Sequence, residues 1–306
     1  MNLRELEYVI KIAEEKSFTK AAEKLFLTPS ALNQQISRIE KELGIPLFYR
    51  SRTGCIPTEA GEIYIRSAQD MIRQKKQTYD QIQDMANSQK GILSVGFPPE
   101  HGTSMFTSVY PKFHTQYPQL SLRAYENSVH QQQKLIASGN LDLGFVTLLD
   151  WQKTSDEYLH IANEELLLAL PSSNPICRKA VYSERSTLPE LDLTLLKNEP
   201  FALMYKESTI YGWVDSIFRK CNMVPNVLFE TTRNITILNM ISHNLCCGLI
   251  PDFYYDPHLD NVSFFCLPEH PTWEIAATYK KGSYLSKPAK AFIHLASEYW
   301  NRRDFL

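Results

Sequence analysis

The chain has 306 residues, of which 43% are hydrophobic and 22% charged, and this balance excludes a disordered protein. The apolar runs fall far short of the roughly 20 residues that a membrane-spanning helix needs, and the charged N-terminus lacks the apolar core of a signal peptide. The six cysteines form no metal-ligand spacing, which excludes a zinc finger. We therefore expect a cytoplasmic protein with reduced thiols, no metal, no cofactor and no membrane partner.

The net charge of −2 hides an asymmetry along the chain. Residues 1–90 carry 14 Lys and Arg against 12 Asp and Glu, which is +2 and leaves −4 for residues 91–306. Residues 20–52 alone reach +3, with 6 basic and 3 acidic side chains. A small basic region on an acidic chain points to a polyanion partner, although an ordinary solvated surface explains this charge equally well.

Three helices are predicted in the first 44 residues. Apolar side chains recur with helical spacing over residues 3–13. Ser17 is placed to cap a short second helix, and Thr28 followed by Pro29 begins a third, which ends before Gly44. The tight connection between the second and third helices predicts a helix-turn-helix.

The third helix has two distinct faces. The apolar stripe, expected to face the core, is Leu32, Ile36, Ile39 and Leu43. The opposite stripe is polar, with Arg38 on its flank, and comprises Ser30, Asn33, Gln34, Ser37 and Lys41. Asn and Gln can make paired hydrogen bonds to adenine in a major groove, whereas a merely solvated face favours Glu/Lys pairs. We therefore favour a DNA-reading helix over a solvated one.

A hairpin and a long helix are expected next. Residues 46–58 form two short apolar segments around a basic turn, which predicts a wing with Arg50 and Arg52 at its tip for a phosphate or a minor groove. Thr58 then caps a polar helix that runs to about residue 88. Its coiled-coil spacing favours dimerisation over packing on its own domain, through Tyr64, Ala68, Met71, Lys75, Thr78, Ile82 and Met85.

From residue 91 onward, strands and helices alternate. Strands are predicted at 92–97, 121–125, 143–147, 166–170, 227–230, 247–250 and 275–279. Helices are predicted up to about residue 114 and at 131–138, 211–221, 235–243 and 287–302. This alternation indicates an α/β domain with a largely parallel sheet.

The chain resembles the LysR-type transcriptional regulators in residues 17–25, 28–44, 46–48 and 58–61, and more loosely in residues 117–118 and 135–144. The resemblance implies an α/β protein overall, with an N-terminal all-α winged helix-turn-helix domain over residues 1–58 and a linker and dimerisation helix over 59–89. It also implies an effector domain over 90–306, similar to periplasmic binding proteins, with lobe one at 91–163 and 268–306 and lobe two at 164–267. One departure is Pro29, because the family commonly has its proline one residue later, where this chain has Ser30.

The implied function is a sequence-specific, DNA-binding transcriptional regulator that responds to a small-molecule effector between the lobes. An organic acid or an amino-acid-like metabolite is the expected effector class. The implied partners are double-stranded DNA, RNA polymerase and a second copy of the chain, which pairs through the linker helix. The resemblance also implies that the chain assembles into a homotetramer. The predicted DNA-binding residues are Thr28, Pro29, Ser30, Asn33, Gln34, Ser37, Arg38, Lys41, Arg50 and Arg52.

Effector ligands of two-lobed α/β domains bind where strands end and helices begin. The residues expected there are Pro99, Glu100, His101, Gly102, Thr103, Asn127, Ser128, Thr147, Lys206, Ser208, Thr209, Thr232, Arg233 and Asn234. Glu100 would repel a plain anion unless His101 or another base offsets it. Lys206 and Arg233 are the candidates to neutralise a carboxylate.

Three other interpretations compete with that of a metabolite-responsive regulator. An enzyme would need a nucleophile with a base, a metal cluster or a phosphate loop, and adjacent Glu100 and His101 are weak evidence for one. A solute-binding protein would not need residues 17–44. A thiol switch through Cys177 and Cys221, or through Cys246 and Cys247, competes with the view that buried cysteines are small apolar residues.

Overall fold

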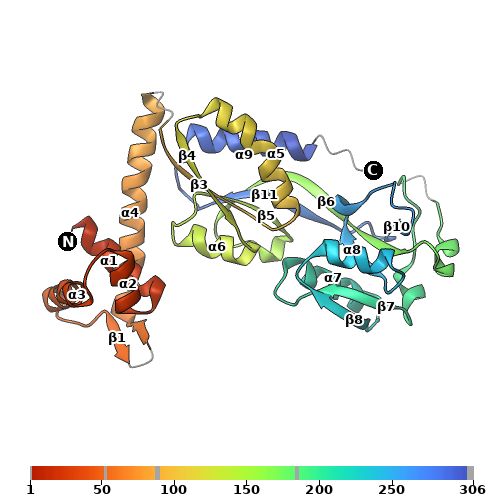
Figure 1. The fold of residues 1–306 in the computed structure, drawn as a ribbon, viewed down its shortest axis with the longest axis horizontal. Coiled ribbons are helices and arrows are strands. Elements are labelled where there is room, and N and C mark those ends of the chain that lie inside the picture. Colours follow the sequence, from red (N-terminus) through yellow and green to blue (C-terminus); the bar gives the residue numbers. More distant parts are fainter. Residues whose placement is uncertain (1, 52–53, 87–89, 183–185, 302–306) are drawn as a thin grey trace. The chain divides into compact units, whose positions relative to one another are not determined.

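The computed structural model of the protein describes residues 2–51, 54–86, 90–182 and 186–301. The chain divides into two compact units, Met1–Ser88 and Gln89–Leu306, and each is described by itself (Figure 1). Within the described ranges, none of the helices combines the length and the apolar character needed to cross a membrane.

The N-terminal unit contains four helices and a hairpin among its described residues: α1 Leu3–Glu15, α2 Phe18–Lys24, α3 Pro29–Leu43, β1 Phe48–Ser51, β2 Gly54–Pro57 and α4 Glu59–Met85. The predicted caps are confirmed. The side chains of Ser17, Thr28 and Thr58 accept hydrogen bonds from backbone N–H groups in the first turns of α2, α3 and α4. Gly44 ends α3 in the left-handed conformation, with φ 72°. Asn2 caps α1 as those three side chains cap α2, α3 and α4, so side-chain capping begins all four helices, including the two that flank the tight α2–α3 turn.

The core of this unit lies beneath α3. Leu32 and Ile36 are fully buried and Ile39 is nearly so, as the apolar stripe predicts. The prediction is wrong for Leu43, which is 48% exposed. Leu43 is the last residue of α3, and Leu47 and Phe48 fill the core once the chain has turned at Gly44.

The long helix α4 uses only part of its apolar seam within its own unit. Ala68 is buried in a cluster with Leu6 and Ile10 of α1, and Tyr64 packs against that cluster. Further along, Ile82 is 58% exposed and Met85 is 85% exposed. The first turns of α4 therefore follow the alternative interpretation, packing on their own domain, and the last turns leave apolar side chains exposed.

The C-terminal unit, Gln89–Leu306, is called the effector unit below, after the domain that the resemblance implies. It alternates strands and helices: β3 Gly91–Phe97, α5 His101–Gln116, β4 Leu120–Glu126, α6 Val129–Ala137, β5 Leu143–Leu148, β6 Glu157–Pro171, β7 Pro200–Met204, α7 Thr209–Lys220, β8 Asn226–Thr231, α8 Asn234–Ser242, β9 Gly248–Pro251, β10 Val262–Cys266, β11 Thr272–Tyr279 and α9 Lys287–Asn301. Short 3-10 turns lie at Asp150–Gln152, Pro175–Lys179, Leu193–Leu196 and Asp252–Tyr254. Helices α5 and α9 pack together on one side of the β3–β5 sheet, and α6 covers the other (Figure 1).

The expectation of a largely parallel sheet is wrong for the middle of this unit. The order is β10-β6-β11-β5-β3-β4, with β9 also on β6, and β7-β8 form a separate pair. Only the β3–β4, β3–β5 and β7–β8 pairs are parallel, and the remaining pairs between these strands are antiparallel. The reason is that β6 and β11 are long crossover strands that connect two lobes, whereas parallel pairs arise within strand–helix–strand units.

Strand β6 changes partners along its length. Its residues up to Glu165 pair with β11, and Glu165 lies opposite Thr272. From Leu166 onward it pairs with β9, and from Leu167 with β10. The position between Glu165 and Leu166 is therefore the point at which β6 leaves β11 and joins β9 and β10.

Candidate functional site

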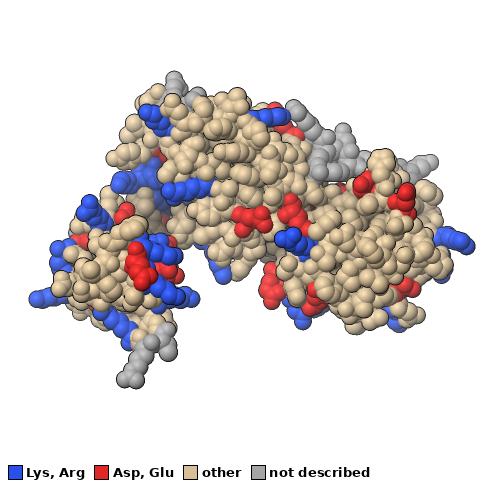
Figure 2. Space-filling view, viewed as in Figure 1, with Lys and Arg blue, Asp and Glu red and all other residues tan. Residues whose placement is uncertain are grey.

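The polar face of α3 is exposed as predicted. Ser30, Gln34, Ser37, Arg38 and Lys41 are exposed, and Asn33 is half-buried. Thr28 and Pro29, at the start of the helix, are exposed as well. Figure 2 shows Lys and Arg side chains spread over the N-terminal unit with acidic ones between them. The helix thus presents short polar and amide groups to solvent while its opposite face fills the core.

Arg50 is not at the tip of the wing but on β1, where it lies opposite Cys55. Its guanidinium donates to Asn33 Oδ1 at 2.9 Å and to Glu40 Oε2 at 3.2 Å, and it lies 4.5 Å above the Phe18 ring. The wing and α3 are therefore connected through Asn33, one of the side chains predicted to read a base. Arg52 lies outside the described residues.

Arg38 is bound to the first turn of α1. Its guanidinium donates to Glu5, whose carboxylate also accepts from the backbone N–H of Asn2 in a capping box. The Asn2 hydrogen bond, and then Arg38, lower the pKa of Glu5. Arg38 thereby connects the flank of α3 to α1 while its own side chain stays 60% exposed.

The effector unit contains a pocket of about 300 Å³. Nine of the predicted effector-binding residues line it: Pro99, Glu100, His101, Ser128, Thr147, Ser208, Thr209, Thr232 and Asn234. They come from both lobes. Four helices, α5, α6, α7 and α8, begin at this pocket, and Ser128 and Ser208 are the caps of α6 and α7. Because helix N-termini carry partial positive charge, the pocket offers sites for negatively charged groups.

Five predicted residues are not among the lining. Gly102 is buried against Pro98, where a Cβ would come within 2.5 Å of the proline ring. Thr103 donates to Glu126 at 3.0 Å. The backbone of Asn127 bonds to Phe97 and Gln132. Lys206 and Arg233 are exposed. Lys206 lies two residues before Ser208, the cap of α7, and Arg233 lies one residue before Asn234, the first residue of α8, and both Ser208 and Asn234 line the pocket.

Glu100 connects the two lobes. Its carboxylate accepts from the backbone N–H of Asn234 at 2.9 Å and of Ile235 at 3.2 Å, at the start of α8, and from Tyr254 Oη at 2.7 Å. Its φ of 66° is a conformation that side chains other than glycine adopt at a cost. Burial and this carboxylate raise the pKa of Tyr254. The N-terminus of α8 is thus already bound to an anion that the chain itself supplies.

Sequence reasoning missed eight lining residues: Pro98, Val129, His130, Met204, Tyr205, Glu207, Ile210 and Trp273. Most flank a predicted residue, so that extending each predicted helix start by one turn would have found them. Trp273 carried no such signal. It lies on β11, stacks on Trp213 with ring centroids 5.0 Å apart, and donates to the buried Glu164.

The thiols are poorly suited to a redox switch. All six cysteines are free. Burial raises the pKa of each, to about 11 for Cys55 and about 12 for Cys247. Because the thiolate is the reactive form, these values oppose oxidation.

Two family models match the chain. The LysR substrate binding domain covers residues 86–301, and the bacterial regulatory helix-turn-helix protein of the lysR family covers residues 3–62. The chain belongs to the LysR family of transcriptional regulators. LysR-type proteins combine a DNA-binding helix-turn-helix with an effector-binding domain, and the fold described above has both parts.

Relatives and solved structures agree with this assignment over nearly the full length. The transcriptional regulator YcgK of Bacillus subtilis is 27% identical, over 97% of this chain and 94% of its own. A full-length OxyR variant from Pseudomonas aeruginosa superposes with a TM-score of 0.68 at 22% identity, covering 97% and 94% of the two chains. The LysR-type regulator CbnR, solved with its target DNA, gives a TM-score of 0.57 at 18% identity, covering 97% and 99%.

Proposed function

We propose that this LysR-type regulator reads a specific DNA sequence through α3 and changes its DNA complex when an amino-acid-like metabolite binds in the pocket of the effector unit. The observation that carries the DNA part is the exposed polar face of α3 opposite an apolar face whose Leu32, Ile36 and Ile39 are buried. We further propose that the protein acts in the cytoplasm, because its target is chromosomal DNA, and that it has no catalytic role.

On DNA, α3 enters the major groove and Gln34 pairs with a base, because its amide is exposed and extends from the middle of the helix. Ser30, Ser37 and Lys41 reach neighbouring bases or phosphates. Arg50, and Arg52 beyond it, contact phosphates through the wing. Asn33 reads a base only after it releases Arg50, so that phosphate binding by Arg50 and base reading by Asn33 occur together.

The lining of the pocket favours an amino-acid-like effector over a plain organic acid. Among its lining residues in the described ranges are two carboxylates, Glu100 and Glu207, but neither Lys nor Arg. The starts of α6 and α7, with the hydroxyls of Ser128, Ser208 and Thr209, suit a carboxylate. Glu207 and Glu100 suit an ammonium group. Pro98, Met204, Ile210 and Trp273 supply an apolar wall for a side chain.

The proposed mechanism is a shift between two arrangements of the lobes. An effector that touches α6 on one lobe and α7 on the other binds the closed arrangement better, and only such a difference in affinity can change the DNA complex. We also propose that the exposed apolar residues at the end of α4 pair two chains, so that two recognition helices read half-sites about one DNA turn apart. Tetramer formation and contact with RNA polymerase stay predictions.

Glu100 and His101 are the pair that an enzyme would use. Both oxygens of Glu100 accept hydrogen bonds from α8, and one accepts from Tyr254 as well, which gives this carboxylate a structural role rather than that of a general base. The His101 ring packs at 5.2 Å from Phe253 and 5.9 Å from Trp300.

The test of the DNA part is binding of the full-length protein to the DNA upstream of its own gene, titrated against salt. Gln34→Ala should cost about 1–3 kcal/mol of discrimination between this DNA and a scrambled duplex. Gln74→Ala, at an exposed position on α4, is the matched control and should leave discrimination unchanged. Equal binding of both duplexes by the unchanged protein would overturn the proposal.

The test of the effector part is thermal unfolding with amino acids, amines and simple carboxylates. Amino-acid-like ligands should raise the unfolding temperature, and Glu207→Gln should weaken this effect. Lys206→Ala, an adjacent side chain outside the lining, should not. Stabilisation by a simple carboxylate alone would contradict the proposed effector class.

A further inference from the structure

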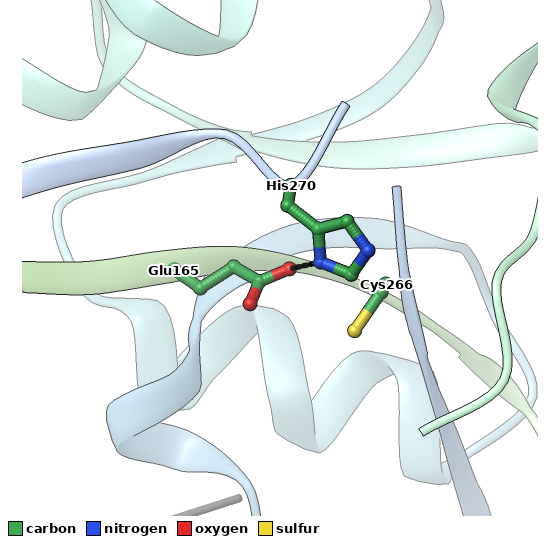
Figure 3. Close-up of side chains that lie close together, drawn as sticks. All are labelled: Glu165, Cys266 and His270. Atoms are coloured by element: carbon green, nitrogen blue, oxygen red, sulfur yellow. Dashed lines mark hydrogen bonds and ion pairs between the residues drawn. The ribbon is translucent and has the colours of Figure 1, made fainter. Parts of the chain in front are cut away.

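Outside the pocket, three side chains with metal-ligating chemistry converge in the effector unit. They are Glu165 on β6, Cys266 at the end of β10 and His270 in the turn that leads to β11 (Figure 3). One ligand atom from each lies within 4.8 Å of the other two. His270 Nδ1 and Glu165 Oε1 are 2.9 Å apart. A thiol, an imidazole and a carboxylate therefore surround one point.

A second carboxylate orients the imidazole from its other side. Glu190 Oε1 is 3.4 Å from His270 Nε2. Backbone pairing fixes the position of Glu190, because Cys266 N–H donates to Pro189 O and Leu191 N–H donates to Cys266 O, both at 3.0 Å. A metal-ligating histidine usually donates its second ring N–H to such a carboxylate. The geometry thus assigns Nδ1 as the metal-facing nitrogen and Glu190 as its partner beyond.

The burial of the cluster suits an ion that enters from solvent. Cys266 is fully buried. The side chains of Glu165, Glu190 and His270 retain 16%, 22% and 25% exposure, so that one side of the cluster is open to water. An ion held here would have three protein ligands and an open position for a water molecule.

We propose that Glu165, Cys266 and His270 bind a divalent transition-metal ion, with Zn²⁺ the best match, and that Glu190 positions His270. Tetrahedral Zn²⁺ with bonds of about 2.0–2.3 Å needs ligand atoms roughly 3.3–3.8 Å apart. The present separations, 2.9 Å between Nδ1 and Oε1 and at most 4.8 Å for the other pairs, lie on either side of that range. A mixed sulfur, nitrogen and oxygen set suits zinc better than the hard ions Mg²⁺ and Ca²⁺, which prefer oxygen alone.

Binding replaces two contacts of the ligand atoms by metal bonds, one between His270 and Glu165 and one between Cys266 Sγ and Ser186 Oγ at 3.1 Å. In the contact at 2.9 Å, Nδ1 carries a proton and donates it to Oε1. On binding, Nδ1–Zn²⁺ and Oε1–Zn²⁺ bonds replace this contact, and the neutral imidazole moves its single proton from Nδ1 to Nε2, where it faces Glu190. The Cys266 thiol forms the Zn–S bond and releases its proton to solvent, as thiols do on coordination. The ion keeps its charge of two throughout, and no oxidant or reductant takes part.

The proposed site joins the two crossover segments of the effector unit. Glu165 is the last residue of β6 that pairs with β11, and His270 precedes β11 on the other crossover segment. Leu166 N–H donates to Pro271 O at 3.0 Å, which places the two crossover segments side by side where β6 changes partners. An ion bonded to both segments would hold the lobes in one arrangement. The site is separate from the pocket, and the proposal is independent of the effector class.

The experiment uses the untagged full-length protein, treated with a chelator and then titrated with Zn²⁺ or Co²⁺. One ion per chain should bind, and Co²⁺ should give tetrahedral visible bands with a thiolate-to-cobalt charge-transfer band. Cys266→Ser should abolish the charge-transfer band. Cys55→Ser, which removes a similarly buried cysteine from the other unit, should preserve it.

Two further variants separate metal binding from folding. His270→Gln, at a partly exposed position, should abolish the Zn²⁺-dependent rise in the unfolding temperature. Glu190→Gln should weaken Zn²⁺ binding about 10- to 100-fold, while the charge-transfer band of the Co²⁺ form remains. Absence of the band in the unchanged protein, or its survival in Cys266→Ser, would overturn the proposal. The cluster would then be a hydrogen-bonded Glu–His–Glu brace.

Discussion

Helix α3 and the pocket of the effector unit differ in how far along the chain their parts are spread. The exposed polar residues of α3 lie within residues 30–41, and one helix positions them all. The pocket is lined by residues from Pro98 to Trp273, and the Glu100 carboxylate bonds to an amide 134 positions away. A surface made by one helix depends on a few buried side chains beneath it, whereas the pocket depends on the packing of two lobes.

The largest effect should come from the core below α3. Ile36 is fully buried, so Ile36→Ala should cost about 2–5 kcal/mol and unfold the N-terminal unit at a lower temperature. The thermal transition of the effector unit should not move. Calorimetry of the full chain measures both, with Lys41→Ala as the exposed control. A matching shift in both transitions would show that the units do not unfold separately.

Next in size is the bond between the lobes. Glu100→Gln leaves a single carbonyl oxygen where the carboxylate accepted from two amides and a phenol, and its NH2 group meets N–H and O–H donors. We expect a loss of about 1–3 kcal/mol in the unfolding free energy of the effector unit. Chemical denaturation is the measurement. Glu207→Gln, exposed beside the same pocket, should change stability by less than about 0.5 kcal/mol.

Arg50→Ala should affect DNA binding more than stability. An exposed ion pair contributes about 0–1 kcal/mol to folding. Losing one phosphate contact should reduce the slope of log affinity against log salt by about 1. Arg66→Ala on α4 is the control for charge alone, since Arg66 pairs only loosely with Glu62 at 3.8 Å. An unchanged slope would mean that Arg50 stays bound to Asn33 and Glu40 in the DNA complex.

The smallest effect, and one of opposite sign, is expected in the turn between α2 and α3. Phe26 has a φ of 56° and is 96% exposed, so it combines a strained backbone with a side chain that packs on little. Phe26→Gly should raise the unfolding free energy of the N-terminal unit by roughly 0.5–1 kcal/mol. Phe26→Ala keeps the strain and should give no gain. Destabilisation by glycine would show that the ring contributes to packing.

The N-terminal unit was largely predictable because its signals are local. Ser17, Thr28 and Thr58 cap the helices that follow them within three residues, and the faces of α3 follow from helical periodicity. Two features were not predictable in this way. The bond from Arg50 to Asn33 depends on the register of β1 against β2, and the exposure of Leu43 depends on how the chain turns after Gly44.

In the effector unit, the sequence predicted the pocket residues that lie at helix starts. It did not predict which neighbouring side chains point toward the pocket. Ser128, Ser208 and Asn234 line the pocket because caps and first turns face it. Lys206 and Arg233 sit just before those starts and are exposed, so nearness in sequence did not bring their charges into the pocket. Trp273 comes from a crossover strand, and no local pattern links it to the loops that it meets.

The Glu100 carboxylate also competes with free anions for the first backbone amides of α8. A group tethered to the same chain competes at an effective concentration that for short tethers reaches the millimolar range. Any free anion that would use the first amides of α8 must therefore displace the Glu100 carboxylate from them. At the starts of α6 and α7 the capping groups are instead the neutral hydroxyls of Ser128 and Ser208, with which a free anion competes more easily than with a carboxylate.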